Sequence, residues 1–448
     1  MRELKAVCDE LVKFFDLEQV EDLADVLYRT LFADNKNEIL KQYCEIVEDL
    51  ETDWLQKIFQ YYKADRTKGK SQDYTPPSLG KCLAQLVQYD RVKTALDVCC
   101  GSGSLTLQLH KLNKDLEFVC LEFDENVIPF LLFNLCIHDI TAVVCQYDVI
   151  SDRLYKAYKL QKTGSFSDIS ILENFELQVY DIVICNPPFN LSIRSNIENE
   201  EYKLKATKDG NSYFIIFCFN HLIKTGRAGL ILHTAAANRN TTEAADTRRK
   251  LVDNNLLEYI ICNPENMFES TTTQTITMIL SRQNQTNEDL PMVADLTNHH
   301  SEFVRYQNGQ FGGDAHTKRT YSKKFNCLSD DDIDNLLNLL KQRACKTWIH
   351  PLDYNKFIGR NYTIDWVEYI KQKEQKPVPD SIILLSGVLN TEQGMKQIQM
   401  LLGCDPGKVT RMRAICRKEL KEPGKYSEMN PQTYIHAALC ILDDIGHT

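Results

Sequence analysis

The tetrapeptide Asn186-Pro187-Pro188-Phe189 has the most distinctive chemistry in this sequence. It directly follows the apolar run 180–185, which predicts a strand that the two prolines bring to an end. The carboxamide of Asn186 and the carbonyl of Pro187 can each accept one hydrogen of an exocyclic amine, which stabilises the positive charge that grows on the nitrogen as it attacks a methyl group. The motif therefore indicates N-methylation of an amine conjugated to a π-system, with Phe189 as the flat surface for a flipped base.

A glycine-rich turn, Gly101-Ser102-Gly103, lies upstream after the predicted strand Thr94–Cys99. Glycines there let the backbone approach a ligand closely, and Asp97 at the strand end can hold a cationic amine. Glu122 ends the next predicted strand, where a carboxylate can accept hydrogen bonds from both ribose hydroxyls, and Asp148 after the third strand could accept from an adenine amino group. Either acid alone is best interpreted as a solvated carboxylate. The ordered series of turn, acid and acid indicates a nucleotide-like cofactor.

Alternation of short β-rich runs with helical patterns in the middle of the chain predicts a mostly parallel sheet with helices on both faces. The fold class is therefore α/β, with a Rossmann-like core of seven strands. The predicted strands are Thr94–Cys99, Glu117–Glu122, Thr141–Gln146, Asp181–Cys185, Ala228–His233, Leu257–Cys262 and Thr275–Ser281.

Helical spacing of apolar residues dominates both flanks of this region. We expect an N-terminal helical region over 1–66, a catalytic domain over 67–330 and a C-terminal helical region over 331–448 that docks a subunit or contacts DNA. In the last region, helices are predicted after the cap Ser329 and over Glu392–Leu402, Val409–Leu420 and Thr433–Leu442.

Composition narrows the class of protein further. The 448 residues include 43% hydrophobic and 25% charged residues, which is ordinary for a soluble protein. No apolar run reaches membrane-spanning length and no secretory signal is visible, so a cytoplasmic protein is expected. The 16 cysteines form no C-x-x-C pair, so we expect reduced thiols and no metal site. A net charge of −10 argues against binding DNA by overall charge and favours local basic surfaces or a partner.

Four further segments carry a resemblance to the amino-methyltransferases of nucleic acids, and more narrowly to the modification subunit of type I restriction-modification systems. The resemblance runs from about Lys63 to Gln342. Its segments are Asp73-Tyr74-Thr75-Pro76-Pro77, the Asn-Leu-x-x-His helix at 132–138, the fifth-strand entry at 226–232 and the turn Asn263-Pro264-Glu265-Asn266-Met267-Phe268. The chain departs from the family pattern at Val98-Cys99, where Pro-Ala is common, and at Asp139, where glycine is usual.

The resemblance implies a class I methyltransferase fold with S-adenosylmethionine as cofactor. It implies that Tyr74, Thr75 and Pro76 anchor this cofactor together with the glycine turn and Asn186, and that Phe268 sandwiches a flipped adenine opposite Phe189. A buried core aromatic is an equally good interpretation of Phe268. The implied substrate is adenine N6 in double-stranded DNA, and the implied partner is a specificity subunit, with a restriction subunit as a further candidate.

Two alternatives remain open from the sequence. Asn-Pro-Pro-aromatic motifs also occur in enzymes that methylate RNA bases or a protein glutamine amide, and a non-catalytic module that binds DNA or a partner is the alternative of another class. Two basic groups could contact phosphates, although a solvated surface is the better interpretation of each; they are 318–324 and 408–421. The polar segment Asn190–Asn211 is interpreted as a lid that orders over DNA.

Overall fold

The computed structural model describes residues 4–55, 57–58, 75–189, 191–268, 273–282, 290–308, 320–364, 389, 392–402 and 409. The chain divides into two compact units, Met1–Trp366 and Val367–Thr448. The first unit holds the sheet and all described candidate site residues. In the second, the predicted helix Glu392–Leu402 is present as α15. The helices predicted over 409–420 and 433–442 and the basic group 408–421 lie outside the described residues, save for Val409.

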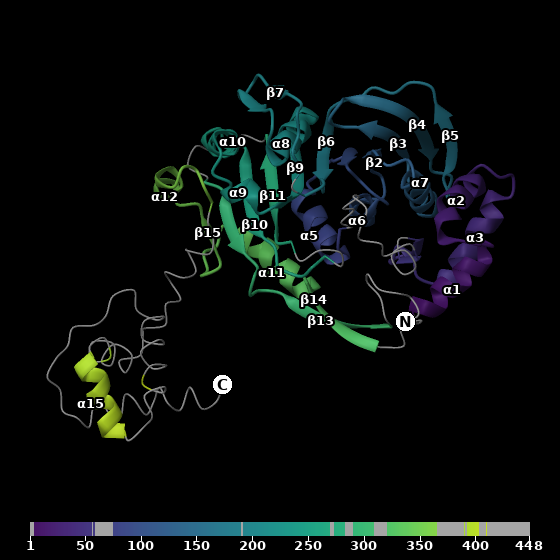
Figure 1. Cartoon of the computed structure of the whole chain (residues 1–448). Coiled ribbons are helices and arrows are strands. Elements are labelled where there is room, and N and C mark those ends of the chain that lie inside the picture. The colour runs from purple at the N-terminus through teal and green to yellow at the C-terminus, as the bar shows by residue number, and fades with distance from the viewer. Residues whose placement is uncertain are drawn as a thin grey trace. The chain divides into compact units, whose positions relative to one another are not determined.

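All seven predicted strands form, and they lie side by side in one sheet (Figure 1). Their order is β3-β2-β1-β6-β9-β11-β10, and the pairings are parallel except for those that β11 makes with its two neighbours. Their bounds are β1 Thr94–Val98, β2 Glu117–Glu122, β3 Ala142–Asp148, β6 Tyr180–Cys185, β9 Leu222–His233, β10 Leu257–Cys262 and β11 Thr275–Ser281. The predicted Rossmann-like class I methyltransferase core is confirmed.

Within the described residues the sheet has eleven strands, because two strands extend the seven-strand core at each edge. They are β4 Arg153–Gln161 and β5 Asp168–Leu172 beyond β3, and β12 Met292–Asp295 and β15 Ile349–Pro351 beyond β10. The seven-strand expectation missed them for two physical reasons. The outermost strand β5 has only five residues and buries none of them, so its apolar alternation is short and weak. Strands β12 and β15 have four and three residues, too few for a periodic signal.

The sheet has its switch point between β1 and β6. The chain runs from β1 outward through β2 and β3, and then returns to the other side of β1 to form β6. Loops that leave the carboxyl ends of two such strands diverge and open a crevice for ligands. The glycine turn follows β1 and the tetrapeptide follows β6, so both sequence motifs lie at this crevice.

Helices cover both faces of the sheet, and alternate strand residues pack against opposite layers. One layer is formed by α5 Pro77–Val87, α6 Ser104–Leu112 and α7 Ile128–Ile137, which share a core with Ala95 and Ile184. The other layer contains α8 Gly210–Asn220 and α10 Thr242–Asp253, which share a core with Leu96 and Cys185. A four-residue helix, α9 Ala235–Asn238, follows β9.

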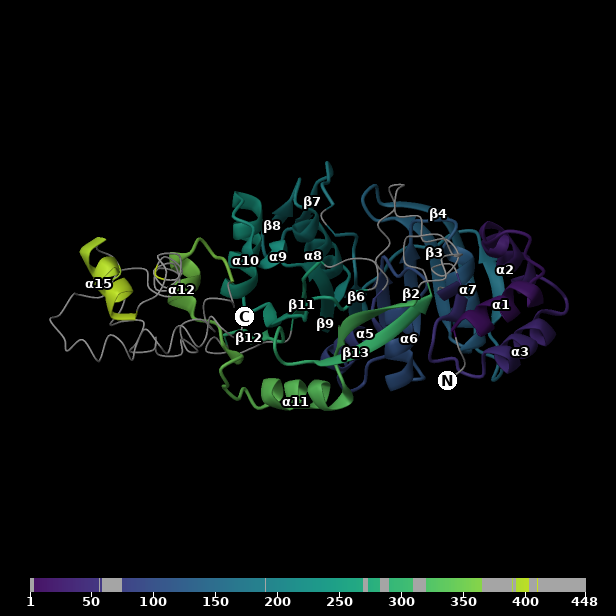
Figure 2. The ribbon, with the colours of Figure 1, turned by 60° about the horizontal axis from the view of Figure 1, so that its bottom comes forward.

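The N-terminal helical region packs against α7 and the β4–β5 edge (Figures 1 and 2). Its elements are α1 Leu4–Phe14, η1 Val20–Asp22, α2 Leu23–Leu31 and α3 Lys36–Val47. Phe133 of α7 contacts Phe15 and Tyr43, with ring centroids 6.1 and 5.0 Å away. Lys36 donates to the carbonyl of Ser167 at 2.7 Å. The helices therefore share a core with the central sheet. The predicted boundary at 66/67 lies outside the described residues.

The first part of the predicted C-terminal region belongs to the compact unit of the sheet. It contains α11 Asp330–Lys341, strand β15 and α12 Tyr354–Gly359. Ser329 and Asp332 form a reciprocal capping box at the start of α11, as the sequence predicted for this cap. A two-stranded ribbon precedes it, made of β13 Ser301–Asn308 and β14 Thr320–Cys327. Among the described residues, no helix is long and apolar enough to cross a membrane.

Candidate active site at the carboxyl edge of the sheet

The glycine turn has a backbone that few residues adopt. Cys99, Gly101 and Gly103 all have positive φ, of 59°, 57° and 94°. A Cβ atom on Gly103 would lie 3.0 Å from a methyl carbon of Leu131, so a side chain there would meet both backbone strain and a close contact. Glycine is thus required at Gly103 in the turn that follows β1, and the use of this turn for binding a ligand stays a prediction.

Glu122 lies beside the turn at the end of β2. Its carboxylate accepts the backbone N–H of Gly101 at 2.9 Å and that of Asp124 at 2.8 Å. Burial raises the pKa of Glu122, against the effect of these hydrogen bonds. A carboxylate has four lone-pair positions, so Glu122 keeps capacity for the ribose hydroxyls expected from the sequence.

Asp97 is fully buried below the turn. One oxygen, Oδ2, accepts the backbone N–H and the hydroxyl of Thr106 at 3.0 and 2.6 Å. The other, Oδ1, is buried and has no hydrogen-bond partner among the described residues. Burial and the nearby charge of Glu122 raise the pKa of Asp97 to about 7, although the bonds from Thr106 act in the opposite direction. A buried acceptor of this kind fits a cationic donor, as the ammonium group of S-adenosylmethionine would provide.

Asp148 ends β3, the third strand of the series. Its carboxylate accepts from the backbone N–H groups of Ile150 and Ser151 at 2.9 and 3.2 Å, and from the Ser151 hydroxyl at 2.7 Å. These bonds fix the turn that follows the strand and hold the carboxylate in place. Its predicted contact with the adenine of the cofactor stays a prediction.

Asn186 follows β6 and is oriented by Thr75. The carboxamide nitrogen of Asn186 donates to the Thr75 hydroxyl at 2.9 Å. The amide oxygen, the atom that the proposed chemistry needs as an acceptor, is therefore directed away from Thr75. The Thr75 carbonyl also accepts the hydroxyl of Ser104, the first residue of α6. Thr75 thus joins the cofactor side of the site to the reactive side.

Pro76 follows as the residue before α5, and Tyr74 lies outside the described residues. Ser102 is buried, and its hydroxyl donates to Asp53 of the N-terminal region at 2.6 Å. Its predicted cofactor contact stays a prediction. Pro187 and Pro188 continue from Asn186 as the sequence predicted, without regular secondary structure.

The two aromatic candidates lie together at the edge of the sheet. Phe189 and Phe268 contact each other edge to face, with centroids 5.6 Å apart and planes at 88°. Phe268 is 2% exposed and belongs to the core. Rings in direct contact leave no space for a third ring between them in this conformation, so a sandwiched base requires at least one of them to turn.

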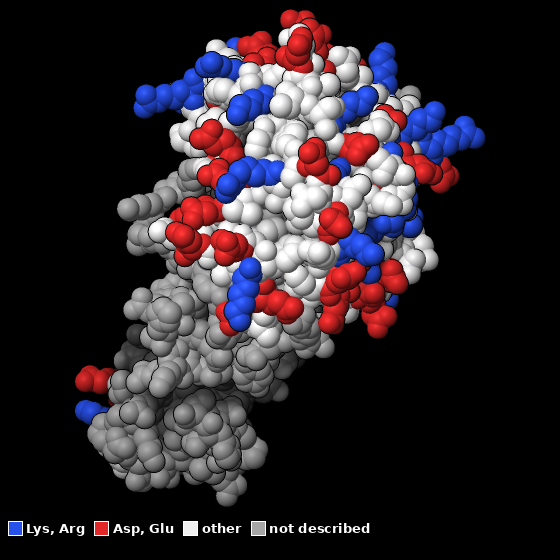
Figure 3. All heavy atoms as spheres, turned by 90° about the vertical axis from the view of Figure 1, so that its right-hand side faces the viewer, with Lys and Arg blue, Asp and Glu red and all other residues white. Residues whose placement is uncertain are grey.

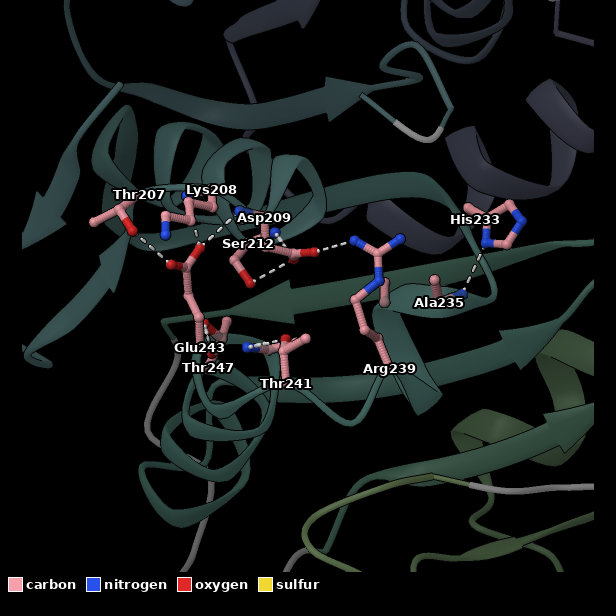
Figure 4. Close-up of polar contacts among 12 residues, drawn as sticks. Thr207, Lys208, Asp209, Ser212, His233, Ala235, Arg239, Thr241, Glu243 and Thr247 are labelled. Carbon is pink, nitrogen blue, oxygen red and sulfur yellow. Dashed lines mark hydrogen bonds and ion pairs between the residues drawn. The ribbon is translucent and has the colours of Figure 1, made fainter. Parts of the chain in front are cut away.

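The turn that carries Phe268 is anchored by polar contacts that could not be predicted from the sequence. Buried Asn263 donates to the Thr275 hydroxyl and accepts from the Thr277 hydroxyl, both at 3.0 Å. His233, paired with Thr275, was also missed: its Nδ1 accepts the backbone N–H of Ala235 at 2.9 Å (Figure 4). Threonines and a histidine at strand ends are common, so only the pairing of β9, β10 and β11 brings them together.

The chain that follows the tetrapeptide forms a hairpin and returns at Asp209. The hairpin strands are β7 Ile197–Asn199 and β8 Leu204–Ala206. Asp209 accepts from Ser212 and, at 2.7 Å, from Arg239 (Figure 4). Glu243 accepts from Thr207, Lys208 and Asp209. Burial acts to raise the pKa of Glu243, but these hydrogen bonds outweigh it and lower the pKa. These bonds hold the C-terminal end of the expected lid in place. The ordering of the lid over DNA stays a prediction.

Comparison with known proteins identifies the family to which this chain belongs. The sequence pattern of the N-6 DNA methylase family matches residues 47–377, about three quarters of the chain. The chain belongs to this family. The N-6 DNA methylase match includes the glycine turn, the tetrapeptide and the Phe268 turn, and it begins before Asp53.

Two curated relatives and one solved structure agree with this membership. The chain is 23% identical over 403 residues to the type I restriction enzyme MpnII methylase subunit of Mycoplasma pneumoniae, covering 84% of this chain and 67% of the relative. It is 22% identical over 351 residues to the MjaVIII methylase subunit of Methanocaldococcus jannaschii, covering 74% of this chain and 55% of the relative. The fold is similar to that of a type I methyltransferase subunit from Streptococcus thermophilus, with a TM-score of 0.53, 16% identity, and coverage of 81% of this chain and 79% of that one.

Proposed function

We propose that this chain transfers a methyl group from S-adenosylmethionine to N6 of a flipped adenine in double-stranded DNA. The observation that carries the proposal is Asn186 at the switch point, with its amide nitrogen held by Thr75. In this orientation the amide oxygen lies on the side away from Thr75, where it can accept from the substrate amine. Membership in the N-6 DNA methylase family supports adenine N6 as the position methylated.

The residues around the glycine turn fit the cofactor. Gly101 and Gly103 adopt the left-handed backbone of the turn. Asp97 offers a buried acceptor for the ammonium group, and Glu122 offers acceptors for the ribose. Asp148 and the Thr75-Pro76 segment complete the set. When bound, S-adenosylmethionine supplies an electrophilic methyl group on its sulfonium.

Asn186 and Pro187 then act on the amine. Their oxygens accept the two N6 hydrogens and stabilise the charge that develops on nitrogen in the transition state. A neutral amide suits this task better than a carboxylate, because a carboxylate would also stabilise the sulfonium ground state and so lower the barrier less. The two prolines keep the acceptors in place, since their backbone cannot rotate about φ.

Phe189 and Phe268 are the base-binding pair in this proposal. Their edge-to-face contact is the state without a base, and a base that leaves the duplex stacks on the face of Phe189. Phe268, buried at the edge of the core, closes the other side of the pocket.

We further propose that a separate specificity subunit selects the DNA sequence, with a restriction subunit as an additional partner. The relatives above are named as type I methylase subunits, and the chain's net charge of −10 is unfavourable for binding phosphates unaided. On the described part of the face with the N-terminal helices, acidic and basic side chains are interspersed (Figure 3). That face offers no continuous basic track for a duplex.

A transfer assay tests the proposal. The chain is purified alone and with a co-expressed specificity subunit, and incubated with tritiated methyl donor and DNA, tRNA, ribosomal RNA or protein. We expect label in adenine N6 of DNA when the partner is present. Label in RNA or in a glutamine amide would replace the DNA proposal, and cofactor binding without transfer to any substrate would favour a non-catalytic module.

A further inference from the structure

The N-terminal helical region reaches the glycine turn through Asp53. Oδ2 of Asp53 accepts the Ser102 hydroxyl at 2.6 Å and the Asn134 amide at 3.1 Å. The same Asn134 amide donates to the Ser102 carbonyl at 3.0 Å. Ser102 and Asn134 are 2% and 3% exposed, whereas Asp53 is partly exposed, so the two donors are buried on the protein side of this triangle. Residues outside the turn thus hold both the side chain and the carbonyl of Ser102, the central residue of the turn.

The turn depends on such external contacts. Gly101 and Gly103 flank Ser102, and glycines in left-handed conformations have many alternatives of similar energy. Glu122 holds the turn from one side through the Gly101 N–H. Asp53 holds Ser102, because its charged carboxylate accepts a short hydrogen bond from the Ser102 hydroxyl. Hydrogen bonds to a charged acceptor are stronger than those between neutral groups.

Asp53 itself lies on an anchored segment. The next two residues, Trp54 and Leu55, are buried. The indole N–H of Trp54 donates to the Asp49 carbonyl at 2.8 Å. Glu51 forms an ion pair with Lys111 of α6. The carboxylate therefore approaches the turn from a frame that is already ordered, which is what a positioning residue requires.

We propose that Asp53 is a positioning residue for cofactor binding: it holds Ser102 and thereby keeps the glycine turn in its binding conformation. This inference rests on the proposed use of S-adenosylmethionine. Without Asp53 the turn populates other conformations. The apparent affinity for the cofactor is then the intrinsic affinity multiplied by the fraction of molecules whose turn is in the binding conformation. The N-terminal helices thus contribute to the cofactor site without contacting the cofactor.

The experiment compares Asp53→Ala, Asp53→Asn, Ser102→Ala and the double variant Asp53→Ala/Ser102→Ala in the full-length protein. Glu51→Gln is the matched control, because it removes an ion pair of the same segment that does not touch the turn. Calorimetry gives the Kd for S-adenosylmethionine, a thermal melt checks folding, and steady-state kinetics separates the KM values for cofactor and DNA.

We expect Asp53→Ala to weaken cofactor binding roughly tenfold, the scale of one hydrogen bond to a charged group. Asp53→Asn should lose less, because its amide oxygen can still accept from Ser102. The double variant should bind like Asp53→Ala, because both changes remove the same bond. The KM for DNA and kcat at saturating cofactor should stay at their wild-type values.

A Kd for a folded Asp53→Ala that lies within twofold of wild type would overturn the inference, and so would an equal loss in Glu51→Gln. If Asp53→Ala does not fold, the comparison of Asp53→Asn and Ser102→Ala with Glu51→Gln decides in the same way. Wild-type protein that binds no S-adenosylmethionine would instead refute the proposed function, and the inference with it.

Discussion

The two sides of the crevice are held by different kinds of contact. On the cofactor side the acceptors are carboxylates, as Glu122 accepts from Gly101, Asp97 from Thr106 and Asp53 from Ser102. On the reactive side, neutral side chains meet across long distances, as Asn186 meets Thr75, 111 residues earlier. The difference suits the ligands: a cationic, hydroxyl-rich cofactor needs charged acceptors, whereas an uncharged amine needs acceptors that respond only as its charge develops. Binding and chemistry should therefore be separable by mutation.

The largest effect is expected on the reactive side. Asn186→Ala should lower kcat by roughly 10²–10³, the scale for losing one oriented polar group in a transition state. Cofactor affinity should change little, because none of the carboxylates is altered. Single-turnover transfer and calorimetry measure the two quantities; a loss of cofactor binding equal to the loss of rate would erase the proposed separation.

Glu122→Gln should weaken cofactor binding and leave the rate of methyl transfer nearly unchanged, which is the opposite of the effect expected for Asn186→Ala. If Glu122 binds the ribose as proposed, losing this charged acceptor, which also holds the Gly101 N–H, should raise the Kd of the cofactor roughly 10- to 100-fold. The rate at saturating cofactor should remain within a few fold of wild type. Titration by calorimetry together with kcat at high cofactor concentration checks this, and a kcat collapse at saturation would contradict it.

The pH dependence of cofactor binding should report on Asp97. Its pKa is about 7 in the free protein, so the carboxylate is protonated below this pH and must release a proton before it can accept an ammonium group. Affinity should therefore rise with pH and level off above about 7, falling about tenfold one pH unit below. Calorimetry in buffers of different ionisation enthalpy should detect the released proton. Asp97→Asn should remove the dependence; an unchanged profile would assign it to another group.

Thr75→Val should have the smallest effect on the reaction, although Thr75 contacts both sides of the crevice. It removes the hydroxyl that orients Asn186 but keeps the side-chain shape and the carbonyl that accepts from Ser104. We expect roughly a fivefold fall in kcat, the scale of one neutral hydrogen bond of about 1 kcal/mol. A larger fall in cofactor affinity than in kcat would show that Thr75 belongs mainly to the cofactor side.

Long apolar strands and the motifs at their ends could be predicted without a structure. The seven core strands have enough β-rich residues for a clear signal, and the order of glycine turn, acids and tetrapeptide along the chain indicated which strand ends carry chemistry. The edge strands could not be predicted. Strand β15, for example, has three residues and exists because β12 offers it a pairing partner.

The partners of each site residue were also beyond prediction. Ser102 was expected to contact the cofactor, but its hydroxyl donates to Asp53, 49 residues earlier in a region interpreted only as helical. Phe268 was given two interpretations: the structure confirms that it is a buried core aromatic, in contact with Phe189, whereas its role in sandwiching a base stays a prediction. Such contacts depend on which helix covers which face, and no local pattern contains that information.

The sequence by itself determined the chemistry that this protein can perform, because residue type and strand position define which atoms can accept a proton or stack on a base. Only the tertiary structure decided how those atoms are held. The switch point between β1 and β6 brings the glycine turn to Asn186-Pro187-Pro188-Phe189, and Thr75 joins them. The physical reason is that orientation comes from contacts between residues far apart in the chain, which form only when the sheet and its two helical layers pack.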